Sequence, residues 1–406
     1  MLFRSEIRPF RAIRAASAKA GTVIAPPYDV MSEAEARALL AANPDSFVRV
    51  SRPEVMLPPG SDPHSPAAYA AAREEFAHML ASGLLVQDPT PSYYLYGQTM
   101  GSHFQVGLVA AFSVEEYDQN LIKKHEFTRP DKERDRVAHI DATNCQTGMV
   151  FLAYRDHEPL NSLIRRGTEG TPEWRVTTED GVEHVLWRVS DPAAVDAITR
   201  AAAELPCTYV ADGHHRSAAA SIVHRERAGQ DGAHGWFLAG LFPASTLQIL
   251  AYNRAVKDLR GHSPETLLAA IRAHYDVSVT TEPAPSGRGR ATMYLAGTWY
   301  ELVARAVPSD PVEALDVSML QDRVLRPLLG IDNPRTDKRI DFVGGIRGWK
   351  ELQSMVDAGT HGVAFHMYAT SLDQLFAVAD VNNVMPPKST WFEPKLRDAV
   401  AMHSIG

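Results

Sequence analysis

The chain contains few cysteines, with only Cys145 and Cys207 among its 406 residues. Two cysteines this far apart in sequence make neither a disulfide framework nor a CxxC metal site. We expect two reduced thiols that are mostly buried. Reduced thiols fit the reducing cytosol, so the sequence favours a cytoplasmic location.

Long apolar runs are also absent. No stretch approaches the roughly 20 apolar residues that a membrane-spanning helix needs. The first residues, Met1 to Glu6, lead into Pro9 without the apolar segment of a signal peptide. We therefore expect a protein that is neither exported by such a signal nor embedded in a membrane.

The sequence has no surplus of positive charge. Lysine and arginine number 41 against 49 aspartates and glutamates, the formal net charge is −8, and no basic tail or stripe occurs. Because nucleic-acid binding normally needs such a stripe, we expect no nucleic-acid partner. A local basic pocket for a small phosphate is still compatible with this balance.

Helix and strand patterns alternate along the chain and predict an α+β fold, with a mixed sheet and flanking helices. Strands or hairpins are expected at 47–50, 93–99, 104–114, 149–154, 173–189 and 208–211. Helices are expected at 32–42, 67–83, 191–205 and 217–228. We expect a region 1–255 and a region 256–406, although no clear linker marks the boundary, and a single domain is the alternative.

The strongest local signal is the turn Asp212-Gly213-His214-His215-Arg216, which lies between a short apolar strand and an alanine-rich helix. The first N–H groups of a helix and its dipole favour an anion, and Arg216 can grip phosphate oxygens. His214 and His215 can donate hydrogen bonds. Asp212 would repel a bare phosphate, which indicates that it holds Mg²⁺ or accepts a proton from a hydroxyl.

Two other interpretations of this turn stay open. In the first, Asp212 caps the helix and the histidines only pack. In the second, the histidines bind zinc, although neither an HExxH spacing nor a cysteine partner is present.

The polar segment 123–136 has two interpretations. It could be a solvated charged helix, which is the usual fate of such a run. Because Pro130 interrupts a helix, we favour a loop that folds over a phosphate donor. Its candidate phosphate-binding residues are Lys124, His125, Thr128 and Arg136, and Glu126 is a candidate base or metal ligand.

Two proline-rich segments carry candidate substrate-binding residues. In the segment 25–30, two prolines stiffen a loop that presents Tyr28 and Asp29, and a purely structural corner is the alternative. In the segment 385–395, Lys388 could contact a second anion. Anchoring of the C-terminal tail is the interpretation we favour there.

Residues 210–216, followed by a helix of small residues, resemble the signature of the ParB/sulfiredoxin-like superfamily. That superfamily includes the nucleotide-binding ParB N-terminal domain, sulfiredoxin and free L-serine kinases. The chain also resembles the DUF1015 family over nearly its whole length. The residues that carry this second resemblance are Pro9-Phe10, 25–30, Lys124-His125-Glu126 with Thr128 and Arg136, 212–216, and 385–395.

The resemblance implies a ParB/sulfiredoxin-like core that is elaborated by additional α/β segments. It also implies that Gly213 to Arg216 bind the phosphates of a donor and that Asp212 lies nearest the reacting hydroxyl or the metal. The kinases have a further acidic residue early in their chain, and Glu6 is the candidate closest to it by position.

The function that this resemblance implies is phosphoryl transfer to a hydroxyl, with free L-serine as acceptor and ATP, ADP or pyrophosphate as donor. Mg²⁺ is the expected cofactor. The chain has no P-loop and no protein-kinase motif set, but phosphoryl transfer needs positioning and charge neutralisation rather than those motifs. The alternatives are a ParB-type nucleotide-binding regulator without transfer activity and a phosphatase. Homodimerisation also stays open.

Overall fold

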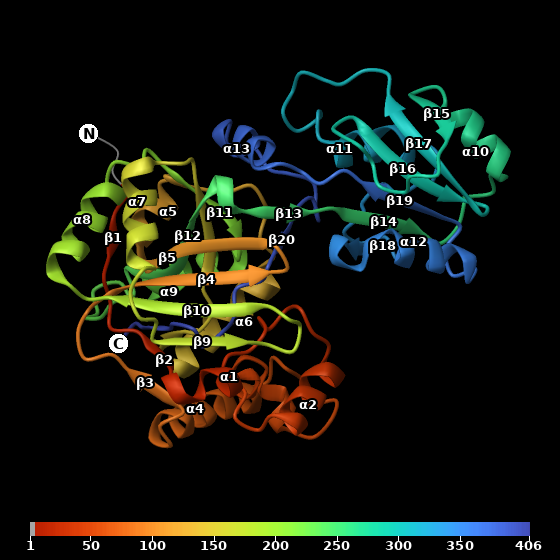
Figure 1. The fold of residues 1–406 in the computed structure, drawn as a ribbon. Coiled ribbons are helices and arrows are strands. Elements are labelled where there is room, and N and C mark those ends of the chain that lie inside the picture. Colours follow the sequence, from red (N-terminus) through yellow and green to blue (C-terminus); the bar gives the residue numbers. More distant parts are fainter. Residues whose placement is uncertain (1–4) are drawn as a thin grey trace. The chain divides into compact units, whose positions relative to one another are not determined.

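The computed structural model describes residues 5–406 and divides into two compact units (Figure 1). Unit 1 holds the described residues up to Leu247 together with Pro394–Gly406, and unit 2 holds Gln248–Glu393. Unit 2 is therefore an insertion in the sequence of unit 1. The predicted boundary after residue 255 falls inside a strand of unit 2, Tyr252–Val256.

Unit 1 is built on a nine-stranded mixed sheet. Its strand order is β6-β11-β8-β12-β5-β4-β10-β9, with β1 paired to β5. The β12–β8 and β11–β6 pairs are parallel and the others are antiparallel, which confirms the predicted mixed sheet. The strands are β1 (Ile7–Arg8), β4 (Tyr93–Met100), β5 (His103–Ser113), β6 (Ile122–Lys123), β8 (Val150–Tyr154), β9 (Trp174–Thr177), β10 (Glu183–Val189), β11 (Thr208–Asp212) and β12 (Trp236–Pro243).

Helices flank this sheet, and α1, α2 and α4 gather beside β9 and β3 in Figure 1. The helices of unit 1 are α1 (Ala20–Val23), α2 (Glu33–Ala42), α3 (Val48–Ser51), α4 (Pro66–Ala81), α5 (Val114–Asp118), α6 (Pro130–Thr143), α7 (Glu158–Gly167), α8 (Pro192–Ala202) and α9 (His214–Glu226). Two short strand pairs complete the unit, β2 (Ile13–Ala15) with β3 (Leu85–Gln87), and β7 (Cys145–Gln146) with β21 (His403–Ser404).

The core of unit 1 lies between the sheet and its helices. It consists of fully or almost fully buried aliphatic and aromatic side chains from neighbouring strands, among them Leu95, Leu108, Phe112, Leu152 and Leu241. Burial of one such side chain stabilises the fold by roughly 1.5–3 kcal/mol relative to an exposed position. This core fixes β8, β11 and β12, which carry the residues of the turn and their neighbours.

The expected strand at 47–50 was wrong, because α3 is a helix at Val48–Ser51. The Ser51 N–H donates to the Phe47 carbonyl at 3.0 Å, and the Arg52 N–H donates to the Val48 carbonyl at 2.8 Å. A four-residue apolar run looks the same in a buried strand and in a buried helical turn, so its pattern alone does not separate the two.

The loop expected across residues 123–136 was wrong in its second half. Pro130 begins α6 instead of interrupting it. The first helical position needs no N–H donor and suits the fixed φ of proline, so a proline there starts a helix. Residues 124–129 do form a loop, between β6 and α6.

Unit 2 contains a six-stranded antiparallel sheet in the order β15-β17-β16-β19-β14-β18. Its strands are β14 (Tyr252–Val256), β15 (Tyr275–Val279), β16 (Arg290–Leu295), β17 (Thr298–Ala304), β18 (Ile340–Gly344) and β19 (Val363–Met367), and β13 (Gln248–Leu250) pairs with β20 (Trp391–Glu393). The helices are α10 (Pro264–Ile271), α11 (Asp316–Leu320), α12 (Gly348–Asp357) and α13 (Leu372–Asp380). Within residues 5–406, every helix is too short or too polar to span a lipid bilayer.

Candidate functional site

The predicted turn lies where β11 ends and α9 begins. Gly213 precedes the helix with φ +90°, a backbone conformation that favours glycine. A Cβ atom at this position would also lie only 3.0 Å from Arg216 Nε. Two features therefore favour glycine at this position: the positive φ of the turn and the close approach of the Arg216 side chain to the backbone.

Asp212 forms an ion pair with a residue from the C-terminal tail. Lys395 Nζ donates to Asp212 Oδ2 at 2.9 Å, and the Gly213 N–H donates to Asp212 Oδ1 at 2.7 Å. Burial would raise the pKa of Asp212, but Lys395 and Arg216 outweigh it and hold the pKa well below the usual range. Asp212 is therefore ionised at neutral pH, and its side chain is 32% exposed.

The carboxylate of Asp212 does not cap α9. The helix has no side-chain cap at its first residue, and the Asp212 contact goes to its own neighbour, the Gly213 N–H. The interpretation of Asp212 as a helix cap was wrong. The second part of that interpretation, that the histidines pack, agrees with the burial of His214, whose exposed fraction is 5%.

Arg216 is held by the strand beside β11. Its Nη1 donates to the Met149 carbonyl, one residue before β8. A Cβ atom on Gly148 would lie 3.4 Å from Arg216 Cδ and 3.0 Å from Asp398 Oδ1. Gly148 therefore lets the Arg216 side chain and the Asp398 carboxyl group approach the same stretch of backbone.

Two buried histidines pack beside the turn. The rings of His125 and His214 lie 4.5 Å apart, centroid to centroid, in an edge-to-face arrangement. His125 is 2% exposed, and burial lowers its pKa to about 4. Burial likewise holds the pKa of His214 well below its usual value, so both rings are neutral at pH 7.

The neutral histidine pair has unused hydrogen-bonding capacity. Both ring nitrogens of His125 and Nε2 of His214 are buried without a hydrogen-bond partner in the described part of the chain. Glu126 Oε2 lies 3.9 Å from His214 Nδ1. Leaving buried polar atoms unpaired is costly, so these nitrogens are suited to a polar ligand.

The segment 124–129 meets the turn through its backbone. The Arg129 N–H donates to His215 Nε2 at 3.1 Å, so His215 accepts a hydrogen bond there as a neutral ring. Thr128 Oγ1 donates to Glu133 in the first turn of α6. Lys124 Nζ instead donates to the Tyr117 carbonyl at 2.8 Å and lies 4.1 Å from the Tyr117 ring centroid, so its ammonium is bound to α5.

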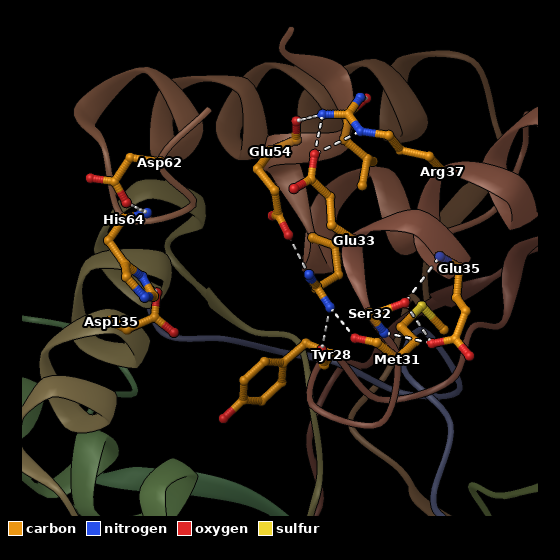
Figure 2. A network of polar contacts seen from close by, with 12 residues as sticks. Tyr28, Met31, Ser32, Glu33, Glu35, Arg37, Glu54, Asp62, His64 and Asp135 are labelled. Atoms are coloured by element: carbon orange, nitrogen blue, oxygen red, sulfur yellow. Dashed lines mark hydrogen bonds and ion pairs between the residues drawn. The ribbon is translucent and has the colours of Figure 1, made fainter. Parts of the chain in front are cut away.

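Tyr28 and Arg136 contact each other and line one pocket together with Arg216. The Arg136 guanidinium lies 3.8 Å from the Tyr28 ring centroid, and its Nε and Nη2 donate to Asp135 Oδ2 at 2.8 and 2.6 Å. Asp135 also accepts from His64 Nδ1 at 2.9 Å. The Tyr28 carbonyl accepts from Arg52 Nη1 at 3.1 Å, and the ring extends away from that polar network (Figure 2).

A pocket with a cavity volume of about 30 Å³ lies between Arg136 and Arg216. Asp398 enters it from the C-terminal tail and is 4% exposed. Burial raises the pKa of Asp398 to about 7, although Arg216 and Arg136 oppose that rise. The other lining residues are Tyr28, Ser51, His139, Ile140, Gln146, Thr147, Gly148, Val150, Phe237 and Leu238.

The structure thus brings the segment 25–30 to the predicted turn. Ala25 and Asp398 exchange backbone hydrogen bonds of 3.3 and 2.9 Å. Asp29 acts electrostatically on His215, Arg216 and Asp398. Residues from the start, the middle and the end of the sequence therefore converge within unit 1.

Two predicted site residues make their contacts elsewhere. Glu6 is exposed, lies 3.8 Å from Arg8, and its N–H donates to Glu116 on α5 at 3.0 Å. Lys388 belongs to unit 2, where its carbonyl accepts from Arg254 Nη2 at 3.1 Å. The functional roles of both residues stay predictions.

Sequence reasoning missed Lys395 and Asp398 as site residues. Lys395 is part of the tail segment that carries the family resemblance, which was the one available signal. Asp398 lies just beyond that segment and has no local pattern that marks it. Lys388 was singled out because it carries a charge on the same stiff loop, yet Lys395 is the lysine that reaches Asp212.

The expected Mg²⁺ has no complete set of protein ligands among the described residues, where no three histidine, cysteine or acidic side chains converge as metal ligands. Mg²⁺ usually takes only one or two carboxylates and completes its shell with water and substrate phosphates. The roles of Asp212 and Glu126 as such ligands stay predictions. The same finding gives no support to a zinc site at the turn.

Comparisons with solved structures give only weak likenesses. A mutant of a free serine kinase in complex with AMP has a TM-score of 0.39 at 9% identity, over 73% of this chain and 91% of that chain. A conserved hypothetical protein from Pyrococcus furiosus has a TM-score of 0.35 at 12% identity, over 71% and 93%. SbnI with a C-terminal truncation, from Staphylococcus aureus, has a TM-score of 0.37 at 13% identity, over 71% and 84%. Likenesses this distant carry no argument about activity.

The sequence itself places the chain in a family. No curated protein sequence matches it. A family model described as "Protein of unknown function (DUF1015)" matches residues 7–318, which is more than half of the chain. The chain therefore belongs to the DUF1015 family.

Proposed function

We propose that this protein is a small-molecule phosphotransferase that moves a phosphoryl group from ATP, ADP or pyrophosphate to the hydroxyl of free L-serine. The observation that carries the proposal is the Asp212–Lys395 ion pair, which lies at the end of β11 directly before the start of α9. A cation, a carboxylate and a helix start at one point are the elements that phosphoryl transfer requires.

The donor's phosphates would lie at the first turn of α9. The N–H groups at the start of a helix lack intrahelical partners, and the helix dipole favours negative charge there. Arg216 and Lys395 supply the neighbouring positive charge. The unpaired nitrogens of His125 and His214 add donors that carry no charge of their own at pH 7.

Asp212 would orient the acceptor hydroxyl or hold Mg²⁺ rather than act as a strong base. An efficient general base has a pKa near the working pH, and the pKa of Asp212 lies far below it. An ionised carboxylate suits Mg²⁺, which when bound neutralises charge on the donor phosphates. Glu126, beside His214, would be the second carboxylate near the metal.

A transfer assay tests the proposal. Purified protein with Mg²⁺ and L-serine would be incubated separately with ATP, ADP and pyrophosphate, and phosphoserine would be detected by mass spectrometry. We expect a serine-dependent product with at least one donor and its loss in Asp212→Asn. Absence of phosphoserine with all three donors would reject the serine kinase, and phosphate release without serine would instead indicate a hydrolase.

A further inference from the structure

The pocket between Arg136 and Arg216 is distinct from the helix start, because its lining includes Arg216 but not Asp212, Gly213 or His214. Its volume of about 30 Å³ is small. A water molecule needs roughly 10–15 Å³ by this measure, so the pocket accepts a group of two or three heavy atoms. A whole nucleotide is excluded, whereas a carboxylate fits.

The pocket is lined by two positively charged side chains and one acidic side chain. Arg136 from α6, Arg216 from α9 and Asp398 from the tail all line it, and both arginines act electrostatically on Asp398. Asp135 is already paired with Arg136, and Asp29 is an exposed carboxylate on the facing loop. When Asp398 is protonated, the pocket keeps two guanidinium groups and loses the negative charge of this carboxylate.

Two further titratable groups that line the pocket, Tyr28 and His139, have pKa values shifted away from neutral pH. Burial raises the pKa of Tyr28 to about 12 and lowers that of His139 to about 4. The pKa of His215 is also lowered by burial. The other lining groups from α3, from the segment before β8 and from β12 are uncharged, namely Ser51, Gln146, Thr147, Gly148, Phe237 and Leu238.

We propose that this pocket is a subsite for a small oxyanion of carboxylate size, which binds between Arg136 and Arg216 while Asp398 takes up a proton. The oxyanion replaces the negative charge of Asp398, so binding of the anion and protonation of Asp398 occur together. Since Arg216 also serves the proposed phosphate site, the inference deepens the proposed function. The class of ligand is an acceptor that carries a carboxylate.

The coupling predicts a definite pH dependence. With a pKa of about 7 for Asp398, the carboxyl group is mostly protonated at about pH 6 and mostly ionised at about pH 8. The apparent Kd of a carboxylate should therefore rise about tenfold between these pH values, because each ligand bound at the higher pH must also bring a proton. Formate suits the test because it remains an anion at both pH 6 and pH 8.

The experiment measures formate binding by the full chain through the shift of its thermal unfolding midpoint, with chloride at equal ionic strength as reference. We expect binding about tenfold weaker at pH 8 than at pH 6 in the wild type. The Asp398→Asn variant should bind formate with equal affinity at pH 6 and pH 8. Glu116→Gln is the matched control, since burial also raises the pKa of Glu116 to about 7 but this residue lies on α5 and outside the pocket. It should retain the wild-type pH dependence.

Equal formate affinity at both pH values in the wild type would overturn the proposal, as would an unchanged pH dependence in Asp398→Asn. A parallel titration uses sulfate, a larger tetrahedral dianion. Proton-linked binding of sulfate without that of formate would overturn the assignment to a carboxylate. Proton-linked formate binding together with a failed transfer assay would reject the serine kinase while retaining the subsite.

Discussion

Two carboxyl groups, Asp212 and Asp398, both interact electrostatically with Arg216, and their surroundings shift their pKa values in opposite directions. Asp212 accepts from the Lys395 ammonium and from a backbone N–H, and its pKa lies well below the usual range. Asp398 is buried in a pocket where two arginines lie near it, yet burial dominates and raises its pKa to about 7. A direct ion pair at 2.9 Å thus outweighs desolvation, whereas two nearby guanidinium groups do not.

This difference in pKa suits the two carboxyl groups to different chemical roles. A carboxylate that is ionised throughout the neutral range can hold a cation or orient a hydroxyl. A carboxyl group that changes charge near pH 7 can couple proton uptake to ligand binding. The comparison can be tested by removing each group, its partner or its backbone support in turn.

The largest effect is expected for the stability of Asp398→Asn. The pKa of Asp398 is raised on folding, so its favourable contribution is complete below about pH 4 and is lost as the pH rises to about 7. The variant avoids this loss and should be more stable than the wild type at about pH 8, by up to about 4 kcal/mol. Denaturant unfolding across this pH range measures the difference. If the free energies of unfolding of the two proteins depend on pH in the same way, folding does not raise the pKa of Asp398.

The next effect concerns Asp212→Asn, which should lower kcat for phosphoserine formation by about a hundredfold and change KM little. Lys395→Met should move the acid limb of the pH profile upward, because the pKa of Asp212 rises without its partner. Asp131→Asn provides the control, since that exposed carboxylate pairs with Arg129 at 2.7 Å on the surface of α6. A KM effect without loss of kcat in Asp212→Asn would assign the residue to binding.

Arg216→Ala should raise the KM for the donor by about tenfold, because it removes a charged hydrogen-bond donor from the proposed phosphate site. Arg129→Ala serves as the matched control. Its side chain is 64% exposed and pairs with Asp131, and the hydrogen bond from Arg129 to His215 comes from its backbone N–H. Steady-state kinetics with varied donor decide the outcome. Equal KM values for the two variants would remove Arg216 from the donor site.

The smallest effect is expected for the backbone that follows Asp398. Ala399 is fully buried with φ +63°, a conformation that costs an alanine about 1 kcal/mol. Ala399→Gly should therefore stabilise the protein by up to about 1 kcal/mol in denaturant unfolding. Ala401→Gly, at a buried alanine without positive φ, should destabilise it by a similar amount. Destabilisation by Ala399→Gly would mean that the methyl group matters more than the strain.

The sequence could predict the parts of the site that are local. Asp212 to Arg216 span the junction of a strand and a helix whose patterns are strong, and the positive φ at 213 favours glycine. The same local reasoning correctly placed the hairpin of β4 and β5. It failed at Val48–Ser51, where a short apolar run fits either structure, and at Pro130, where the position of a proline within a helix decides its effect.

The long-range partners could not be read from the sequence. Lys395 follows Asp212 by 183 positions, and Asp398 meets Arg216 only because the tail returns to unit 1. Charge or motif alone does not specify which of two tail lysines, Lys388 or Lys395, reaches the turn. That choice depends on how residues 248–393 fold before the chain comes back.

The insertion of unit 2 into unit 1 has a consequence for the order of synthesis. The ribosome completes the turn at 212–216 and the whole of unit 2 before it adds Lys395 and Asp398. Domains generally fold as units during synthesis, starting from the N-terminus. The sheet of unit 1 can therefore form early, but a nascent chain lacks both tail residues, and a product truncated before residue 394 would carry Asp212 and Arg216 without either partner. The last residues to be made thus complete the first unit to begin folding.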